Sequence, residues 1–423
     1  MSFNPLLPVT RPALVHASCT TAVWLWGAET WAFVCTLLCD RSRHICSIVA
    51  MQAQLDFFKT LQPWQRTEGP AYERQVSIGS GSFGMVQVGK SSNSLGRVAV
   101  KTLPLKDKKG NLSTHRVQSA WHEIQNTQHL LAKRQTQHVA CDQLTDHGSH
   151  FICCVHEVFF DETSMKAFLV MELADRSLLM EIRRYQVFND EEIRVFAVGM
   201  LRALQWLTQC QVCHNDLSPN NVLLFKPPWG NSFQWLVKLT DFGSSSTSES
   251  PRKCFVTTYN YAAPELLRFV NSTGFTDHGN LPPYTYASDI WSVGVILCQL
   301  MSDDASHNAV IGTDDPKYSR AEAYLAGVTT MLSKMNAKLN DEAEIDPTCL
   351  SNSGLALAKQ MLDAAPADRI TAASAVKHPY FTCPTLLTSP ASYRLNGGDA
   401  VLQRAGTALS RAYALLAGIR GCR

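Results

Sequence analysis

The chain has 423 residues, of which 45% are hydrophobic and 17% are charged. This composition is typical of a folded globular protein of one large or two ordinary domains, and it excludes wholesale disorder. A formal net charge of +2 gives no electrostatic basis for binding nucleic acid or acidic membranes. The 14 cysteines are spread through the chain and lack zinc-ligand spacing, which favours small core residues in a reducing compartment over a disulfide scaffold.

The first fifty residues differ in composition from the rest of the chain. We expect a poorly ordered extension over 1–50, followed by a lead-in segment over 51–71. Residues 20–39 are apolar and aromatic and are long enough to cross a bilayer, which would leave the following domain in the cytosol. Glu29 lies near the centre of that stretch and would cost roughly 2.5–3.5 kcal/mol on insertion, so a membrane anchor is the alternative interpretation. Met51 is an alternative candidate for the first residue of the protein.

From Tyr72 onward, short β-rich segments dominate, with Gly and Ser between them. Apolar residues alternate or run together at strand length in five segments, which predicts strands over 74–81, 84–90, 96–103, 152–160 and 167–173. Apolar residues at helical spacing predict one helix among them, over 114–131. The polar stretch 133–150 is expected to be a surface insertion.

After Glu172 the pattern changes to helices. The sequence predicts helices over 191–210, 287–301 and 321–335, of which the second is nearly all apolar and should be buried. An amphipathic helix over 402–419 is expected to pack on the domain. Strands followed by helices, with the join near Met171, indicate an α+β architecture of two lobes joined by a hinge.

A glycine-rich turn links the first two predicted strands. Its glycines allow backbone N–H groups to approach phosphate oxygens. Lys101 follows an apolar run on the next predicted strand, where its side chain would point toward the phosphates. Glu123 in the following helix is the best-placed carboxylate to pair with it. Each feature alone is also common in an ordinary hairpin or strand end. The turn consists of Gly79, Ser80, Gly81, Ser82, Phe83 and Gly84.

The strongest signal is the segment 214–221, which reads HNDLSPNN and directly follows a predicted helix. Phosphoryl transfer to a hydroxyl needs a carboxylate that orients and deprotonates the nucleophile, together with oxygen ligands for Mg²⁺. Asp216 suits the first role and Asn221, five residues later, suits the second. Asp241, in an Asp-Phe-Gly sequence after a strand-like run, supplies a carboxylate for the same ion.

The order of these motifs, followed by Ala-Pro-Glu at 263–265, resembles the eukaryotic protein kinase superfamily. The resemblance implies the two-lobed kinase fold, with a small antiparallel β-rich N-lobe that has one main helix and a larger, mostly helical C-lobe. It also implies that Asp289 steadies the catalytic loop and that Arg369 pairs with Glu265. The implied divisions are a kinase domain over 72–381, made of the N-lobe 72–171, the hinge 172–176 and the C-lobe 177–381, and then a helical tail over 382–423.

By the same resemblance, the chain should transfer the γ-phosphoryl group of ATP, held with Mg²⁺, to a protein substrate. Asn221 and Asp241 would hold the metal, while Lys101 and the glycine-rich turn would contact the phosphates. The remaining ATP contacts would come from Met171 at the back of the pocket, backbone groups of Glu172 and Ala174 at the hinge, and the side chains of Val86, Ala99 and Leu223 around the adenine ring.

Thr258 indicates a serine/threonine kinase. It lies seven residues before Glu265, where serine/threonine kinases carry a threonine that bonds to the catalytic aspartate, and the segment lacks the pattern of tyrosine kinases. The NVLLF and VKLTDFG runs are similar to those of a small group of SH3-binding serine/threonine kinases. We expect a cytoplasmic monomer that does not bind nucleic acid.

Two residues depart from the family pattern. Asn215 replaces an arginine that commonly reads a phosphate on the activation segment, so the chain should depend little on such phosphorylation. Ser218 replaces a lysine that neutralises the transferring phosphoryl group, and Lys253 is a candidate substitute for that charge.

Two other functions stay open at this stage. A pseudokinase that binds ATP as a scaffold is favoured by these departures, but its usual signature is the loss of Lys101, Asp216 or Asp241, and all three are present. A small-molecule kinase of the aminoglycoside or choline type is favoured by the likeness of the HNDLSPNN loop. Those enzymes generally lack an Ala-Pro-Glu segment, which this chain has.

Overall fold

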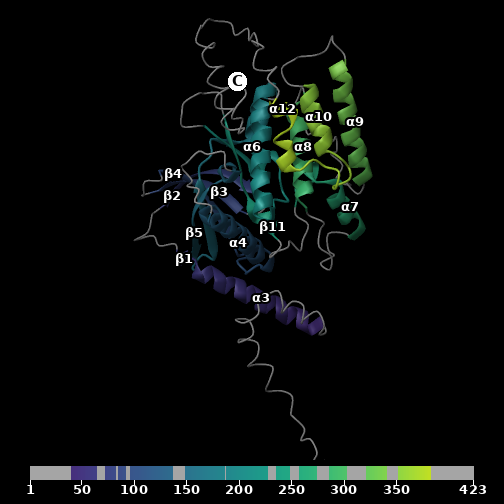
Figure 1. The fold of residues 1–423 in the computed structure, drawn as a ribbon. Helices are drawn as coiled ribbons and strands as arrows, with labels where there is room; N and C mark the ends of the chain where they lie inside the picture. The colour runs from purple at the N-terminus through teal and green to yellow at the C-terminus, as the bar shows by residue number, and fades with distance from the viewer. Residues whose placement is uncertain are drawn as a thin grey trace, which may run out of the picture.

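The structure is a computed structural model with a strand-rich N-lobe and a helical C-lobe, which confirms the predicted fold class (Figure 1). Four sequence predictions lie outside the described residues: the apolar stretch 20–39, the turn residues Ser82 and Phe83, Lys253, and the tail helix 402–419. The structure describes residues 40–63, 72–81, 84–91, 96–136, 148–185, 187–226, 235–247, 257–273, 285–302, 321–340 and 351–382.

The N-lobe contains a six-stranded sheet in the order β1-β5-β6-β4-β3-β2. The five predicted strands are present and pair antiparallel, whereas the short β1 (Gln62–Pro63) was not predicted and pairs in parallel with β5 at the sheet edge. The predicted strands are β2 (Tyr72–Gly81), β3 (Gly84–Ser91), β4 (Arg97–Pro104), β5 (Val155–Asp161) and β6 (Lys166–Glu172).

The helix α4 (Thr114–Thr136) covers one face of this sheet. Side chains alternate between the two faces of a strand. Accordingly, Ala99 and Leu103 of β4 pack with Ile124 of α4, while Val98 and Val100 belong to a separate cluster on the other face. Burial on both faces explains why β4 reads as an apolar run rather than as a polar and apolar alternation.

The predicted surface insertion over 133–150 is wrong for Arg134 and for residues 149–150, which are buried, whereas Lys133 and Gln135 are exposed. Lys133 to Thr136 continue α4, and the short helix η1 (Gly148–Phe151) packs against the C-lobe helix α6 (Asp190–Gln209). Arg134 is buried, and its guanidinium donates to the carbonyl of Ser149. This polar residue can be buried because its guanidinium donates to a backbone carbonyl, which replaces the hydrogen bond that water would make at the surface.

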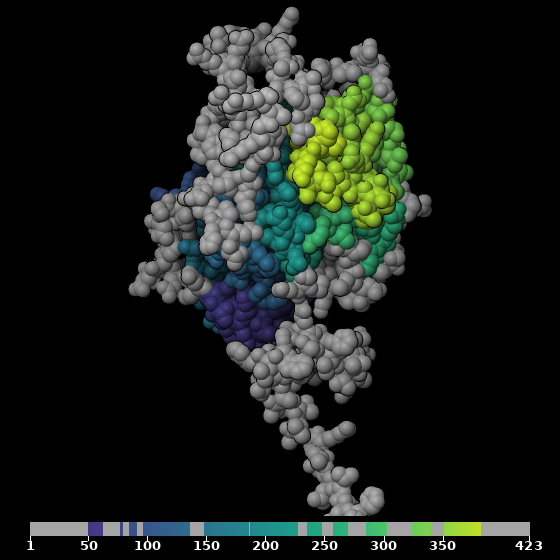
Figure 2. Space-filling view, viewed as in Figure 1, coloured from purple at the N-terminus to yellow at the C-terminus, as the bar shows by residue number. Residues whose placement is uncertain are grey.

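A helix that the sequence did not predict, α3 (Asp40–Thr60), precedes the sheet and packs against α4 (Figure 1). It runs across residue 50, where the boundary between extension and lead-in segment was expected. Leu55 and Phe58 are buried in the N-lobe core, with the ring of Phe58 5.5 Å from that of Phe160. Figure 2 shows the purple surface of α3 continuous with the blue N-lobe. Among the described residues, none of the helices has the length and apolar character needed to span a bilayer.

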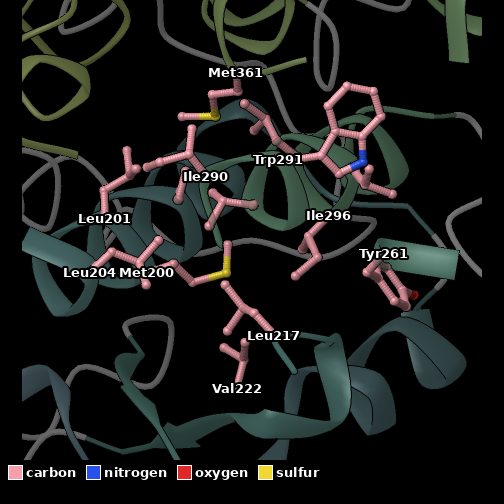
Figure 3. Close-up of a cluster of buried hydrophobic side chains, with 14 of the residues drawn as sticks. Met200, Leu201, Leu204, Leu217, Val222, Tyr261, Ile290, Trp291, Ile296 and Met361 are labelled. Carbon is pink, nitrogen blue, oxygen red and sulfur yellow. The ribbon is translucent and has the colours of Figure 1, made fainter. Parts of the chain in front are cut away.

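The C-lobe is built around α8 (Tyr286–Leu300), in which every residue from Ser288 to Leu300 is buried, as its apolar sequence predicted. Figure 3 shows side chains of α6 and α8 pointing toward one another, with Leu217 and Val222 from the catalytic loop region below them. The predicted helices over 191–210, 287–301 and 321–335 are all present. The other C-lobe helices are α5 (Leu178–Tyr185), α7 (Pro264–Thr273), α9 (Ala321–Asn340), α10 (Asn352–Met361), α11 (Ala372–Ala375) and α12 (Pro379–Thr382).

Two small sheets contain the strands next to residues 214–221 and next to Asp241. One has the order β10-β9-β7, and in the other β11 pairs with β8. Four of the five described free cysteines are buried, in agreement with their reading as core residues. The small elements are β7 (Arg176–Ser177), β8 (Val212–Cys213), η2 (Pro219–Asn221), β9 (Val222–Phe225), β10 (Leu236–Leu239), η3 (Phe242–Ser244), β11 (Ser246–Thr247) and η4 (Tyr259–Tyr261).

Candidate active site

Lys101 lies on β4 and is bound by carboxylates from two other elements. Its Nζ atom lies 2.6 Å from Oε1 of Glu123 on α4 and 2.9 Å from Oδ1 of Asp241. Burial disfavours the charged lysine, but the charges of Asp241 and Glu123 outweigh it and raise the pKa of Lys101. Burial likewise disfavours the Asp241 carboxylate, yet Lys101 holds its pKa below the usual value. Lys101 and Asp241 therefore stay ionised, and the three side chains join the sheet, α4 and the C-lobe.

Asp216 lies in the loop between β8 and η2, where its carboxylate is oriented by Thr258. Oδ1 of Asp216 accepts hydrogen bonds from the backbone N–H and from Oγ1 of Thr258, both at 2.7 Å. Asn221 donates from Nδ2 to the backbone carbonyl of Asp216 at 2.7 Å, and the same Nδ2 lies 3.5 Å from Oδ2. One carboxylate oxygen is thus fixed, while Oδ2 has only a long contact among the described residues and can accept a further donor.

The structure contains both contacts that the family resemblance implied, and the first of them supports the loop over residues 214–221. Asp289 is buried in α8 and accepts from the backbone N–H groups of His214 at 2.7 Å and Asn215 at 2.9 Å, while burial raises its pKa. Arg369 donates to both carboxylate oxygens of Glu265 at 2.7 Å. The carboxylate of Asp289 therefore fixes the loop backbone at His214 and Asn215, while the pair between Arg369 and Glu265 joins the start of α7 to the segment before α11.

The side chains predicted to surround adenine lie in one hydrophobic cluster. Ala99 and Met171 are buried there, and Val86 and Leu223 pack against them. At the hinge, the backbone N–H of Glu172 donates to the carbonyl of Cys154 at 3.0 Å. Ala174, two residues later, is partly exposed.

A hinge contact that the sequence analysis missed joins Glu172 to Lys238 on β10. Nζ of Lys238 lies 2.8 and 2.7 Å from the two carboxylate oxygens of Glu172, and Oε1 also accepts from the backbone N–H of Cys154 at 2.6 Å. The available signal was a single lysine inside an otherwise apolar strand. The pair ties the hinge to the strand that leads into Asp241.

The glycine-rich turn connects β2 to β3, as predicted. Gly79 pairs with Val86 and Ser80 pairs with Met85 across the two strands, and the strand pairing reaches Gly81 and Gly84. A Cβ atom at Gly84 would overlap the backbone carbonyl of Thr102, so only glycine lets β3 approach β4 this closely.

The two residues that depart from the family pattern are both buried. Ser218 is 4% exposed and precedes η2. Asn215 is 3% exposed and donates from Nδ2 to the carbonyl of Ser244 and to Oγ of Ser246, both at 2.9 Å. The sequence analysis treated Asn215 only as a missing arginine. It also missed Asn126, a buried amide three residues after Glu123 on α4.

Comparisons with known proteins match the protein kinase domain to residues 72–381. The serine/threonine-protein kinase crk1 of Schizosaccharomyces pombe is 26% identical over 362 residues, which cover 82% of this chain and 95% of that protein. Mitogen-activated protein kinase 5 of Arabidopsis thaliana is 37% identical over 143 residues, 33% of each chain. The protein kinase gsk3 of Schizosaccharomyces pombe is 30% identical over 204 residues, 45% of this chain and 48% of that protein.

The likeness to SH3-binding kinases stays a prediction, because these comparisons do not test it. The region that matches the kinase domain makes up most of the chain and contains Lys101, Asp216 and Asp241. With the two-lobed fold, it shows that the chain belongs to the protein kinase family.

Proposed function

We propose that this protein is an active serine/threonine kinase that transfers the γ-phosphoryl group of ATP to protein hydroxyls, with Asp216 as the catalytic base. The observation that carries the proposal is the pair of 2.7 Å hydrogen bonds from Thr258 to Oδ1 of Asp216. They fix the carboxylate and leave Oδ2 for a substrate hydroxyl. Relatives named serine/threonine-protein kinases support the same acceptor class.

In the proposed reaction, Oδ2 of Asp216 accepts the proton of the substrate hydroxyl. The hydroxyl oxygen bonds to the γ-phosphorus of ATP while the bond between that phosphorus and the bridging β–γ oxygen breaks, and ADP leaves. Lys101 stabilises the phosphate charge because Glu123 and Asp241 keep it protonated and fixed in direction.

The residues present fit a magnesium ion. Mg²⁺ prefers oxygen ligands and binds through one or two carboxylates together with substrate phosphates. Oδ1 of Asp241 bonds to Lys101, which leaves Oδ2 for a cation. Nδ2 of Asn221 turns toward Asp216, so its Oδ1 points away from that contact. Asp241 and Asn221 would therefore hold the ion, which when bound neutralises charge on the phosphates.

Specific contacts favour this function over the two alternatives. A pseudokinase has no need of a lysine held between Glu123 and Asp241 or of an oriented Asp216, and both arrangements are present. The bidentate pair between Arg369 and Glu265 supports a protein kinase over a small-molecule kinase, whose sequences generally lack the segment that carries this glutamate.

The test is a phosphate-transfer assay with radiolabelled ATP on the full chain, offering basic proteins, choline and an aminoglycoside as acceptors. We expect label on serine and threonine, and a loss of kcat of about a hundredfold or more in Asp216→Asn. The exposed Asp368→Asn variant is the matched control and should keep wild-type turnover. Binding of Mg-ATP without transfer would favour the pseudokinase, and label on a small alcohol would favour the other enzyme class.

A further inference from the structure

Residues 242–246, directly after Asp241, form η3 and the start of β11 and are held from the N-lobe by Asn126. This residue is 2% exposed, and its Nδ2 donates to the carbonyls of Phe242 at 3.1 Å and Ser245 at 2.9 Å. Asn126 follows Glu123 by three residues, so both side chains leave α4 on one face. The placement of α4 that lets Glu123 pair with Lys101 therefore also lets Asn126 reach residues 242–246.

Asn215 holds the same segment from the catalytic loop. Its two hydrogen bonds go to the carbonyl of Ser244 and the hydroxyl of Ser246. The backbone of Asn215 has φ of +69°, a left-handed conformation that asparagine adopts more readily than most other residues. The backbone N–H of Asn215 also donates to Asp289. The backbone of Asn215 is therefore fixed, and this fixes the direction of its side-chain amide.

The two amides therefore bracket one short segment, and their bonds to the carbonyls of Phe242, Ser244 and Ser245 are buried. Phe242, Ser244 and Ser245 are all buried. A buried carbonyl that loses its donor has no water to replace it, so moving the segment away breaks bonds without compensation. The bracketing also keeps Asp241, the residue that precedes the segment, beside Lys101.

We propose that Asn126 and Asn215 are positioning residues that hold residues 242–246 in the catalytically competent arrangement without a phosphorylated residue. The inference rests on the proposed kinase activity. Neither side chain touches the reacting atoms, and each acts through the segment that follows Asp241. At position 215, the hydrogen bonds of the asparagine amide replace an arginine that would bind the segment only after it is phosphorylated.

The test compares Asn126→Ala, Asn215→Ala and the double variant in the full chain, with the exposed Asn336→Ala on α9 as a matched control. We expect each single variant to lower kcat about tenfold and to change the KM for ATP less than threefold, because the hinge and adenine contacts stay intact. Amide hydrogen exchange over 242–247 should be roughly tenfold faster. The double variant should lose less than the product of the single losses, since both release the same segment. The control should match the wild type in all three measurements.

Wild-type exchange over 242–247 and wild-type kcat in both single variants would overturn the inference. So would a loss of kcat that merely follows a fall in melting temperature while exchange in this segment stays normal. If the wild type transfers no phosphate, the proposed function fails, and the exchange measurement still decides whether the two amides hold the segment. If Asn215→Ala does not fold, Ser246→Ala removes one of its bonds from the other end. That variant should speed exchange at least threefold, and unchanged exchange in both Ser246→Ala and Asn126→Ala would overturn the inference.

Discussion

Lys101 joins the two lobes, because it bonds to Glu123 of α4 and to Asp241 of the C-lobe. We predict that Lys101→Met and Asp241→Asn each lower kcat about a hundredfold or more, since positioned charges of this kind are typically worth at least that factor. Both variants should stay folded, as judged by circular dichroism and thermal melting. Retention of more than about a tenth of wild-type turnover in either variant would contradict the assigned roles.

Ser218 tests whether the missing charge limits the enzyme. We predict that Ser218→Lys raises kcat about tenfold with little change in ATP affinity, because a cation near the γ-phosphate acts mainly on charge that develops in the transition state. Ser218 is 4% exposed, so the lysine must extend toward the cleft rather than into the loop. Steady-state kinetics on a protein substrate, with Ser218→Met as a control for side-chain length, measure the effect. An unchanged or lower kcat would show that another group already supplies the charge or that the loop is adapted to serine.

At the scale of elements, α3 belongs to the N-lobe although it precedes the region matched by the kinase family. We predict that Phe58→Ala lowers the free energy of unfolding by about 3 kcal/mol, because the ring is fully buried against Phe160 and leaves a cavity. The melting temperature should fall by roughly 6 °C or more.

The control on the same helix is Lys59→Ala. Lys59 makes only exposed ion pairs, at 3.9 Å to Asp56 and 3.8 Å to Glu162, and such pairs contribute about 1 kcal/mol or less. Equal melting temperatures for Phe58→Ala and Lys59→Ala would show that α3 is not part of the folded N-lobe core.

Across the whole molecule, the contacts described around the site join the two lobes through the chain's own side chains. The Lys101 carboxylate pair, the Asp289 contacts and the two asparagine amides need no added phosphate. We therefore predict that complete dephosphorylation, verified by mass spectrometry, leaves turnover within a factor of two or so. A tenfold fall would mean that a phosphate and a cation outside these contacts control the enzyme.

The residues proposed to carry the chemistry, and most of the secondary structure, could be predicted from the sequence. Phosphoryl transfer restricts which residue types can act, so the lysine, aspartate and asparagine motifs are recognisable in one dimension. The strands of the N-lobe and the long helices of the C-lobe follow from apolar periods that a single segment carries within itself. Lys101, Asp216 and Asp241 could therefore be named as a set before any contact between them was known.

Which polar residues are partners depends on how the elements pack, and this could not be predicted from the sequence. Arg134 looked like a surface residue because its neighbours are polar, yet it is buried with backbone carbonyls as acceptors. The pair between Glu172 and Lys238 spans 66 positions of the chain, and the bonds from Asn126 to residues 242 and 245 span 116 and 119. Periodicity reports which face of an element is buried, but a hydrogen bond between distant segments depends on how the elements pack. For that reason the amides that hold the segment after Asp241 became visible only in the folded protein.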